Sequence, residues 1–363
     1  MKKTIVVVQT AFLGDLILTV PFLQRLKKKY PEYQLVIVCK KGLGSFLKKD
    51  NIVDKFFEIE KSNRKSYKNI LNILNQKQDY QIDYLFCIHR SVRSLLFSAQ
   101  LKAQVKIGYR SMLSRLFLNQ HFIYPKNWPA VIRTFQLLQN VDSEVAKSLS
   151  GQDWAQLNQA NSHGVLPEIA NFFKFQYPGE FTQKTFASQK PMQTQPKRRV
   201  AIFPGSVWAT KRWTQQGFQQ LIALFIKDEF QVDLMGGPDE RTLCEELARA
   251  FPQENIQNFA GRFKVEESIE HLKNYHLVVA NDSAATHMAA LQQIPSVTIF
   301  GPTTLNLGFR PWSDQARVVE NKNLNCRPCG LHGHNKCPLG HHRCMTEISS
   351  EQVYRVCMEL VRE

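Results

Sequence analysis

Residues 277–300 read LVVANDSAATHMAALQQIPSVTIF, which is an apolar run, a polar loop, a helical stretch and a second apolar run. The two runs, Leu277–Ala280 and Val297–Phe300, are continuously apolar, which is typical of strands in a parallel sheet with helices on both faces. The same pattern recurs along the chain. The other predicted strands are Thr4–Val8, Gln34–Cys39, Asp83–Ile88, Val105–Tyr109, Val200–Phe203 and Val232–Met235. The sequence therefore predicts two doubly wound α/β domains.

The length supports two domains. The chain has 363 residues, whereas single hydrophobic cores stop growing near ~250–300 residues. We predict a first domain at 1–182, a linker at 183–199, which is polar and aperiodic, and a second domain at 200–348. The second domain includes a Cys/His-rich segment at 326–345. A C-terminal helix is predicted at 349–363. It begins at a capping Ser349, and its apolar stripe consists of Val353, Val356, Cys357, Leu360 and Val361.

The charge of the chain is strongly basic and unevenly distributed. Lys and Arg number 47 against 31 Asp and Glu, a formal net charge of +16. Residues 1–182 contain 26 basic and 13 acidic residues, a net of +13, so the first domain holds most of the excess. This predicts an anionic partner for the first domain. A lysine-rich solvated surface accounts better for any single run of lysines, but not for the asymmetry between the halves.

Nucleic-acid binders and membrane-spanning or secreted proteins fit the sequence less well. A nucleic-acid binder should interleave aromatic and basic residues on one face, a pattern that is absent from the sequence, so no nucleic-acid partner is predicted. The apolar stretch from Met1 to Leu23 is interrupted by Asp15 and is too short for a clean membrane span or signal peptide. We therefore expect a cytoplasmic protein with reduced cysteines.

In sheets of this kind, ligands bind beyond the carboxyl ends of the strands, so the loops there carry the chemistry. The first such loop, QTAFLGD at 9–15, leads into a helix predicted near Leu16. Asp15 would lie at the start of that helix, where a capping role is the plain interpretation. Gly14 beside it would let a ligand approach the backbone, which makes Asp15 a candidate general base.

The loop FPGSVWATKRWT at 203–214 combines small residues, hydroxyls and two adjacent cations. Such a loop predicts a phosphate cradle built from backbone N–H groups and Lys211. Gly205, Ser206 and Thr210 are its candidate contacts, and Thr214 would cap the next helix. A basic loop with two core tryptophans is the alternative.

The loop at 281–287 enters a predicted helix at Met288–Gln292. The N–H groups of Ser283 and Ala284 would hold a pyrophosphate at the positive end of the helix. Asp282, an anion in such a site, is expected to face sugar hydroxyls. His287 is a further candidate, although a lone helix histidine is more often a structural residue.

The loop after Val232–Met235 contains Asp239 and Glu240, carboxylates that suit the hydroxyls of a ribose. An ordinary Gly-Gly-Pro turn is the plain alternative. The sequence contains no Walker A motif and no complete G-x-G-x-x-G fingerprint, which leaves the common NAD and P-loop interpretations with little support.

Taken together, these motifs resemble those of the bacterial lipopolysaccharide heptosyltransferases, which are glycosyltransferases of GT-B fold. The motifs are F-L-G-D-L-I-L-x-x-P at 12–21, P-G-S-x-W-x-T-K-R-W at 204–213, G-G-P-D-E at 236–240, N-D-S-A-x-x-H-x-A-A at 281–290 and F-G-P-T at 300–303. The C-R-P-C and C-P-L-G-H-H-R-C-M motifs after them are most similar to the branch that adds the second heptose. The resemblance implies two doubly wound domains facing across a cleft.

The resemblance, which runs from Thr4 to Met345, also implies an activity: inverting transfer of L-glycero-D-manno-heptose from ADP-heptose to the lipid A–core acceptor, without a cofactor. Asp15 would be the general base, and Lys211 would stabilise the departing ADP. On the first domain, Gly14, His89, Arg90 and Arg93 would meet the acceptor, although a solvated helix start is the plain interpretation of the two arginines. A peripheral location at the inner face of the cytoplasmic membrane would suit such an acceptor.

Two alternatives keep other functions open. Another nucleotide-sugar transferase or an epimerase of the same architecture would share the fold, whereas a non-enzymatic binder of anionic surfaces would need neither Asp15 nor the phosphate loops.

The cysteines of the Cys/His-rich segment could form a zinc site by composition, but their spacing departs from paired CxxC motifs. We therefore favour a reduced, locally packed segment, formed around Cys326, Cys329, Cys337 and Cys344.

Overall fold

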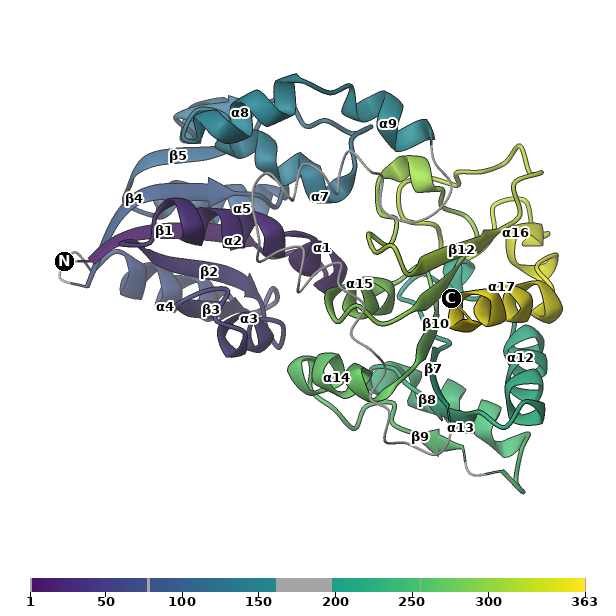
Figure 1. Ribbon diagram of the computed structural model, residues 1–363. Coiled ribbons are helices and arrows are strands. Elements are labelled where there is room, and N and C mark those ends of the chain that lie inside the picture. The colour runs from purple at the N-terminus through teal and green to yellow at the C-terminus, as the bar shows by residue number, and fades with distance from the viewer. Residues whose placement is uncertain (1, 77–78, 161–197, 255, 363) are drawn as a thin grey trace. The chain divides into compact units, whose positions relative to one another are not determined.

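A computed structural model describes residues 2–76, 79–160, 198–254 and 256–362 (Figure 1). The chain divides into two compact units, Met1–Gln156 and Leu157–Glu363. The predicted linker at 183–199 lies outside the described residues except for its last two, of which Arg199 begins a strand. In the described part of the chain, every helix is too short or too polar to span a membrane.

The first unit is built on a six-stranded sheet in the order β3-β2-β1-β4-β5-β6, with every neighbouring pair parallel. The strands are β1 (Lys2–Gln9), β2 (Gln34–Lys40), β3 (Lys55–Ile59), β4 (Tyr80–Cys87), β5 (Ala103–Tyr109) and β6 (Gln120–Phe122). The four strands predicted in this half are confirmed. The two edge strands, β3 and β6, were not predicted.

Helices cover both faces of this sheet. They are α1 (Leu13–Leu18), α2 (Val20–Lys29), α3 (Ser45–Lys49), α4 (Arg64–Leu74), α5 (Val92–Gln100), α6 (Ser114–Phe117), α7 (Ala130–Arg133), the 3-10 turn η1 (Thr134–Leu138) and α8 (Ser143–Ser150). Helix α9 (Trp154–Ala160) follows them in the chain and crosses from the first unit into the second. One core joins alternate strand residues to α4 and α5. On the other face Phe22 of α2 meets Phe86 and Phe135 edge-on, with ring centroids 5.3 and 6.3 Å apart. Both faces are therefore packed, as the apolar strands predict.

The second unit repeats this topology, in the order β12-β11-β10-β7-β8-β9. All pairs are again parallel. The strands are β7 (Arg199–Phe203), β8 (Gln231–Leu234), β9 (Gln257–Asn258), β10 (Leu277–Asn281), β11 (Ser296–Phe300) and β12 (Ala316–Glu320). The four predicted strands are confirmed, and the two unpredicted ones again lie at the edges.

The helical elements of the second unit are α12 (Gln215–Lys227), α13 (Arg241–Arg249), α14 (Val265–His271), α15 (Ala284–Leu291), α16 (Arg343–Thr346) and α17 (Ser350–Arg362), with 3-10 turns η2 (Ala209–Lys211), η3 (Pro238–Glu240), η4 (Leu272–Asn274) and η5 (Leu305–Leu307). Helix α17 lies beside α12 in Figure 1, and its Val353, Cys357 and Leu360 are buried in the same core as α12 and α13. The predicted apolar stripe of the C-terminal helix is confirmed. Ser349 caps this helix, because its hydroxyl accepts a hydrogen bond from the Gln352 N–H at 3.1 Å.

The strand order fixes where each sheet can bind a ligand. In the first unit the order reverses between β1 and β4, and in the second between β7 and β10. Loops leave such a pair of strands in opposite directions, which opens a crevice at their carboxyl ends. Two of these loops belong to each unit: those after β1 and β4, and those after β7 and β10. They are the loops in which the sequence places Asp15, His89, Lys211 and Asp282.

Candidate active site

In the first unit, hydrogen bonds join the loops after β1 and β4. Thr10 Oγ1 lies 2.8 Å from His89 Nδ1 and 2.8 Å from Ser94 Oγ. Ser94 Oγ is also 3.0 Å from His89 Nδ1, and Ser91, which caps α5, lies 2.9 Å from Ser94 Oγ. Both sides of the crevice are therefore held in a fixed arrangement.

His89 has a different role from a cationic phosphate ligand. Burial, and then the nearby charge of Lys61, lower the pKa of His89 to about 4. The ring is therefore neutral near pH 7 and serves as a hydrogen-bonding hub of the loop. The positive charges next to His89 in the sequence are those of Arg90 and Arg93, which are both exposed. Arg90 stacks over the ring of Tyr124 at 4.0 Å, which holds its guanidinium in place.

Asp15 is the third residue of α1, which begins at Leu13 rather than near Leu16. Phe12 is the N-cap residue, so Asp15 does not occupy the capping position. The ammonium groups of Lys40 and Lys61 lie 5.8 and 5.9 Å from the Phe12 ring centroid. Burial and the charges of Lys40 and Arg93 lower the pKa of Lys61, and Asp15 opposes this shift. Asp15 therefore lies near Lys61, which itself lies near Lys40 at the end of β2 and Arg93 in the first turn of α5.

A groove beside α4 and α5 extends this basic cluster. Its volume is about 390 Å³, and its cations are Lys61, Arg64 and Arg93, with Tyr67 and Phe97 among its apolar lining. Lys61 and Arg64 were not predicted as site residues. They follow β3, a strand that the sequence pattern does not reveal, so the sequence gives no signal for the loop after it. Arg93 was predicted, and it donates a hydrogen bond to the Lys61 carbonyl at 2.9 Å.

In the second unit, the loops after β7 and β10 meet in an ion pair. Lys211 Nζ lies 2.6 Å from Asp282 Oδ2, and the two side chains are only 13 % and 8 % exposed. Thr303, after β11, donates a hydrogen bond to the same oxygen at 2.5 Å. The sequence predicts separate tasks for the two charges, phosphate for Lys211 and sugar for Asp282. Their contact shows that the charge of Lys211 neutralises that of Asp282 within the predicted phosphate site.

Asn281, the last residue of β10, holds the loop after β7 in place. Its Oδ1 accepts the Trp213 N–H at 3.0 Å, and its Nδ2 donates to the carbonyls of Pro204 and Gly205 at 2.8 and 3.3 Å. The sequence shows only a polar residue at the end of an apolar run. Its partners are distant in the chain, so this positioning role emerges only in the structure.

Glu240 and Asp239 differ in their surroundings. A Cβ atom on Gly205 would lie 1.8 Å from Glu240 Oε1, so the carboxylate packs directly on this glycine. Glu240 Oε2 accepts the Gly237 N–H at 2.7 Å, and burial raises the pKa of Glu240. Asp239 is exposed. The structure therefore brings Glu240 against the loop after β7 and leaves Asp239 at the surface. Ser206 is buried in this loop, and its carbonyl accepts Arg212 Nε at 2.8 Å.

Helix α15 begins at Ala284, earlier than the predicted Met288. Ser283 is its N-cap residue, and the hydroxyl accepts the Ala285 N–H at 3.4 Å. The N–H groups predicted to bind pyrophosphate thus lie at a true helix N-terminus, beside Asp282. His287 is 4 % exposed on the inner side of this helix, and its Nδ1 has no hydrogen-bond partner among the described residues.

Burial lowers the pKa of His287 to about 4, with Asp282 acting to raise it and Lys211 to lower it. In the unfolded chain a histidine has a pKa of ~6.5, so as pH falls the unfolded state binds the proton before the folded state does. The neutral, buried His287 therefore does not lower the free energy of unfolding above pH ~6.5. As pH falls from there toward 4, the free energy of unfolding decreases by at most about 3 kcal/mol.

His287→Gln should remove this dependence. We expect the free energy of unfolding, measured in urea, to fall less steeply between pH 6.5 and 4 than in the natural protein. His341→Gln is the control, because His341 is exposed. Parallel curves for His287→Gln and the natural protein would contradict a buried neutral His287.

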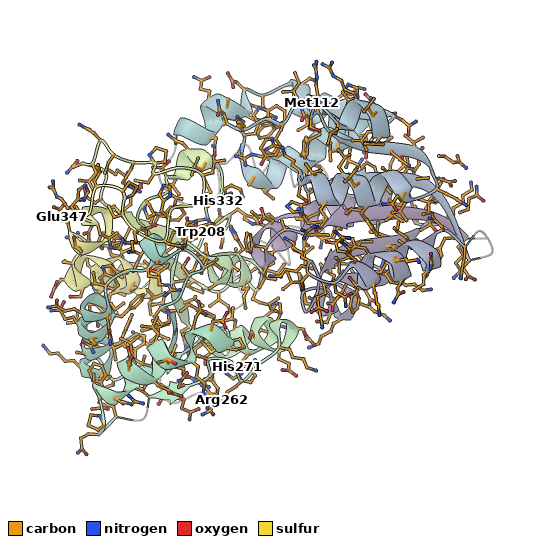
Figure 2. All side chains as sticks on the ribbon, turned by 180° about the vertical axis from the view of Figure 1, so that it is seen from behind. Met112, Trp208, Arg262, His271, His332 and Glu347 are labelled. Carbon is orange, nitrogen blue, oxygen red and sulfur yellow. The ribbon has the colours of Figure 1, made fainter. Side chains whose placement is uncertain are left out.

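The Cys/His-rich segment packs on the loop after β7 (Figure 2). Trp208 and His332 stack, with ring centroids 6.2 Å apart and planes at 8°. Thr210 is predicted to contact a donor, but it exchanges hydrogen bonds with the backbone of His334 at 2.8 Å in each direction. His342 Nε2 lies 2.8 Å from the Thr210 carbonyl. Thr210 therefore joins the segment to the loop.

Arg327 extends this connection to the loop after β11. It forms an ion pair with Glu320 at 2.7 Å and donates to the carbonyls of Gly301 and Thr303. Thr303 in turn holds Asp282. The segment thus supports the side chains around the ion pair.

All eight cysteines of the chain are described and free. Within the described residues, no group of three or more His, Cys, Asp or Glu side chains is arranged to hold a metal. Burial acts to raise the pKa of the Cys337 thiol, but the backbone N–H groups of residues 339–342 lower it below the usual value. These N–H groups therefore favour the thiolate form of Cys337.

We predict that a chelator leaves the fold of this segment intact. The melting temperature should be the same with and without EDTA, and metal analysis of the purified protein should find less than one zinc per chain. Stoichiometric zinc together with chelator-induced unfolding would reverse the prediction for Cys326, Cys329, Cys337 and Cys344.

Comparisons with known proteins agree with this geometry. Residues 73–339 match the family model of glycosyltransferase family 9 (heptosyltransferase). Lipooligosaccharide heptosyltransferase 2 of Haemophilus influenzae is 21% identical over 98% of this chain and 99% of its own length. The enzyme of the same name from Campylobacter jejuni is 28% identical over 46% of this chain, and that alignment spans about half, 52%, of the relative.

A solved structure shows the same fold. ADP-heptose LPS heptosyltransferase II of E. coli superposes with a TM-score of 0.71 at 19% identity, covering 99% of this chain and 98% of that one. The two doubly wound units are therefore of the predicted GT-B type.

Proposed function

The chain belongs to glycosyltransferase family 9, the heptosyltransferases, and on that premise we propose that it transfers L-glycero-D-manno-heptose from ADP-heptose to the lipid A–core acceptor of lipopolysaccharide. The observation that carries this proposal is the Lys211–Asp282 pair at the N-terminus of α15. It places a cation, helix N–H groups and a carboxylate together at the switch point of the second sheet, which suits a sugar diphosphate.

The second unit binds the donor in this proposal. The N–H groups of Ser283 and Ala284 and the ammonium of Lys211 meet the diphosphate, and Gly205 and Ser206 line its cradle. When ADP leaves, negative charge grows on the diphosphate, and Lys211 stabilises it. Asp282 has a second oxygen for a heptose hydroxyl. Thr210 and His287 support this site from within. Thr210 is hydrogen-bonded to the backbone of His334, and His287 is buried near Asp282 and Lys211.

The adenosine ribose is assigned to Asp239 and Glu240. Glu240 lies against Gly205 and so next to the diphosphate loop, whereas Asp239 is exposed in the same turn. Carboxylates accept hydrogen bonds from ribose hydroxyls in related sheets.

The first unit binds the acceptor. Asp15 accepts the proton of the attacking hydroxyl while the anomeric carbon passes through an oxocarbenium-like state, and attack opposite the departing ADP inverts its configuration. Gly14 leaves room for the sugar beside Asp15. Arg90, Arg93 and the groove after β3 supply charge for acceptor phosphates, with His89 holding their loop. No step in this mechanism calls for a cofactor.

The net +13 of residues 1–182 supports a peripheral location of the protein at the inner face of the cytoplasmic membrane, where such an acceptor resides. Similarity to enzymes named heptosyltransferase 2 favours addition of the second heptose.

Mass spectrometry of the products tests the proposal. The protein is incubated with ADP-heptose and with acceptors truncated before or after the first heptose, and the acceptor carrying one heptose should gain the mass of one more. Transfer from a different nucleotide sugar would identify another transferase. A donor that changes its stereochemistry without any acceptor would identify an epimerase, and either result would replace the proposed function.

A further inference from the structure

The segment 84–141 of the first unit contains no acidic residue and eight Lys or Arg residues. It runs from β4 through α5, β5, α6 and β6 to η1. The whole chain has 31 acidic residues, so a run of this length without one produces a strongly cationic surface. Such a surface attracts anionic partners over several ångströms.

The same segment exposes large aliphatic side chains. Of the ten large apolar side chains that are exposed in the described part of the chain, five lie here: Val92, Leu96, Met112, Leu116 and Ile123. Met112 is 88 % exposed, and Figure 2 shows it on the surface of the first unit. Leu116 and Ile123 are 75 % and 69 % exposed. Single exposed residues need no explanation, but a group on adjacent elements marks an interaction site.

Local hydrogen bonds hold these side chains in neighbouring positions. The Arg110 N–H donates to the Phe122 carbonyl at 2.7 Å, which ties the residues before Met112 to those before Ile123. Ser111 and Ser114 exchange hydrogen bonds of 2.6 and 3.1 Å, which fix the turn that carries Met112. Helix α6 then packs beside α5, which carries Val92 and Leu96 one helical turn apart.

Exposed cations surround the aliphatic side chains. Arg110, Arg115 and Lys126 are all exposed. Arg110 also lines a small cavity together with His89 and Arg90, so this surface continues into the predicted acceptor loop. We call it the acid-free face, and it consists of Val92, Leu96, Met112, Leu116, Ile123, Arg110, Arg115 and Lys126.

We propose that the acid-free face docks on the surface of an anionic lipid bilayer, with Met112, Leu116 and Ile123 inserted at the level of the headgroups. Aliphatic side chains gain by leaving water there, and the surrounding cations pair with anionic headgroups. This inference deepens the proposed function and rests on it, because a lipid-linked acceptor is what the bilayer would bring to the loop of His89 and Arg90.

Other occupants fit the face less well. A second copy of this chain would present the same cations without any acid to pair with them, so the two faces would repel each other. Single-stranded nucleic acid is bound through aromatic side chains that stack on bases, whereas the five apolar side chains here are all aliphatic. A bilayer uses both properties of the face at once.

Vesicle sedimentation of the full chain tests the proposal. We expect binding to vesicles of phosphatidylcholine mixed with phosphatidylglycerol, weaker binding in high salt, and little binding to phosphatidylcholine alone. The variant Met112→Ser/Leu116→Ser/Ile123→Ser should lower the partition coefficient about 100-fold or more. Arg115→Gln/Lys126→Gln should lower it about twentyfold.

Matched controls come from α4 of the same unit. Lys65→Gln/Lys68→Gln removes the same charge, and Ile73→Ser removes an aliphatic side chain that is 38 % exposed, so both should bind as the natural protein does. All variants should keep transfer to a deacylated, water-soluble core acceptor, which shows that they are folded. If the natural protein binds anionic vesicles but transfers no heptose, the proposed function is refuted and the proposed docking face is not.

Two results would overturn the inference. One is vesicle binding by the triple variant as strong as that of the natural protein. The other is that the natural protein does not bind anionic vesicles and is a dimer in light scattering, whereas the triple variant is a monomer. That result would make the acid-free face an interface between two copies of the chain.

Discussion

Lys211→Ala should lower kcat by about 100-fold or more and weaken ADP binding as well. The ammonium would stabilise charge that is already present on the bound diphosphate and that increases as ADP departs, so both affinity and turnover depend on it. Steady-state kinetics and calorimetric titration with ADP measure the two effects. An unchanged kcat/KM in the folded variant would exclude this role.

The ion pair complicates this experiment. Lys211 lies 2.6 Å from the buried Asp282, so its removal leaves a carboxylate without its cation, which typically costs ~3–5 kcal/mol in stability. A purely structural Lys211 would therefore also lower activity, through unfolding or displacement of Asp282.

A double-mutant cycle separates the two roles. In an Asp282→Asn background no carboxylate requires neutralisation, so a structural Lys211 should be removable at little cost. If Lys211 acts on the diphosphate, adding Lys211→Ala to Asp282→Asn should still lower kcat about 100-fold. The melting temperatures of Asp282→Asn and of the double variant Lys211→Ala/Asp282→Asn should then be similar.

The central strands of both sheets were predictable because they are buried on every side. In β2, for instance, every residue in Leu35–Cys39 is buried. All four strands that were missed, β3, β6, β9 and β12, lie at the edges of the sheets. An edge strand has a neighbour on one side only, and β3 accordingly mixes charged and half-buried residues. Its sequence therefore lacks the continuous apolar run on which the prediction depends.

The sequence identified the loops of the candidate site, but not which side chains of those loops contact one another. Strand ends point to the loops, and the loops with Asp15, Lys211 and Asp282 lie at the two switch points. The contact of Glu240 with Gly205 and the bonds of Thr210 to His334 join residues far apart in the chain. Such contacts depend on how the loops fold over one another, which a periodicity in one segment does not encode.

Asp15→Asn should abolish transfer while leaving ADP-heptose affinity nearly intact. The amide keeps the size of the side chain but does not accept a proton at a useful pKa, so loss of general-base assistance should cost about 10²–10⁴-fold in the chemical step. Donor affinity should change little, because the loops proposed to bind the donor belong to the second unit. Single-turnover kinetics and titration with ADP-heptose measure the two quantities on one preparation.

A structural role of Asp15 predicts a different result. Asp15 lies in the first turn of α1 without occupying its N-cap, so loss of its charge should cost only about 0.3–1 kcal/mol through the helix dipole. That change would leave turnover near normal. Asp54→Asn is the matched control, because it removes one carboxylate just before β3, at the opposite end of the strands from Asp15, where it accepts the Leu35 N–H at 2.8 Å. Full activity in Asp15→Asn would remove Asp15 from the mechanism, whereas loss of activity at an unchanged melting temperature, with Asp54→Asn fully active, identifies it as the base.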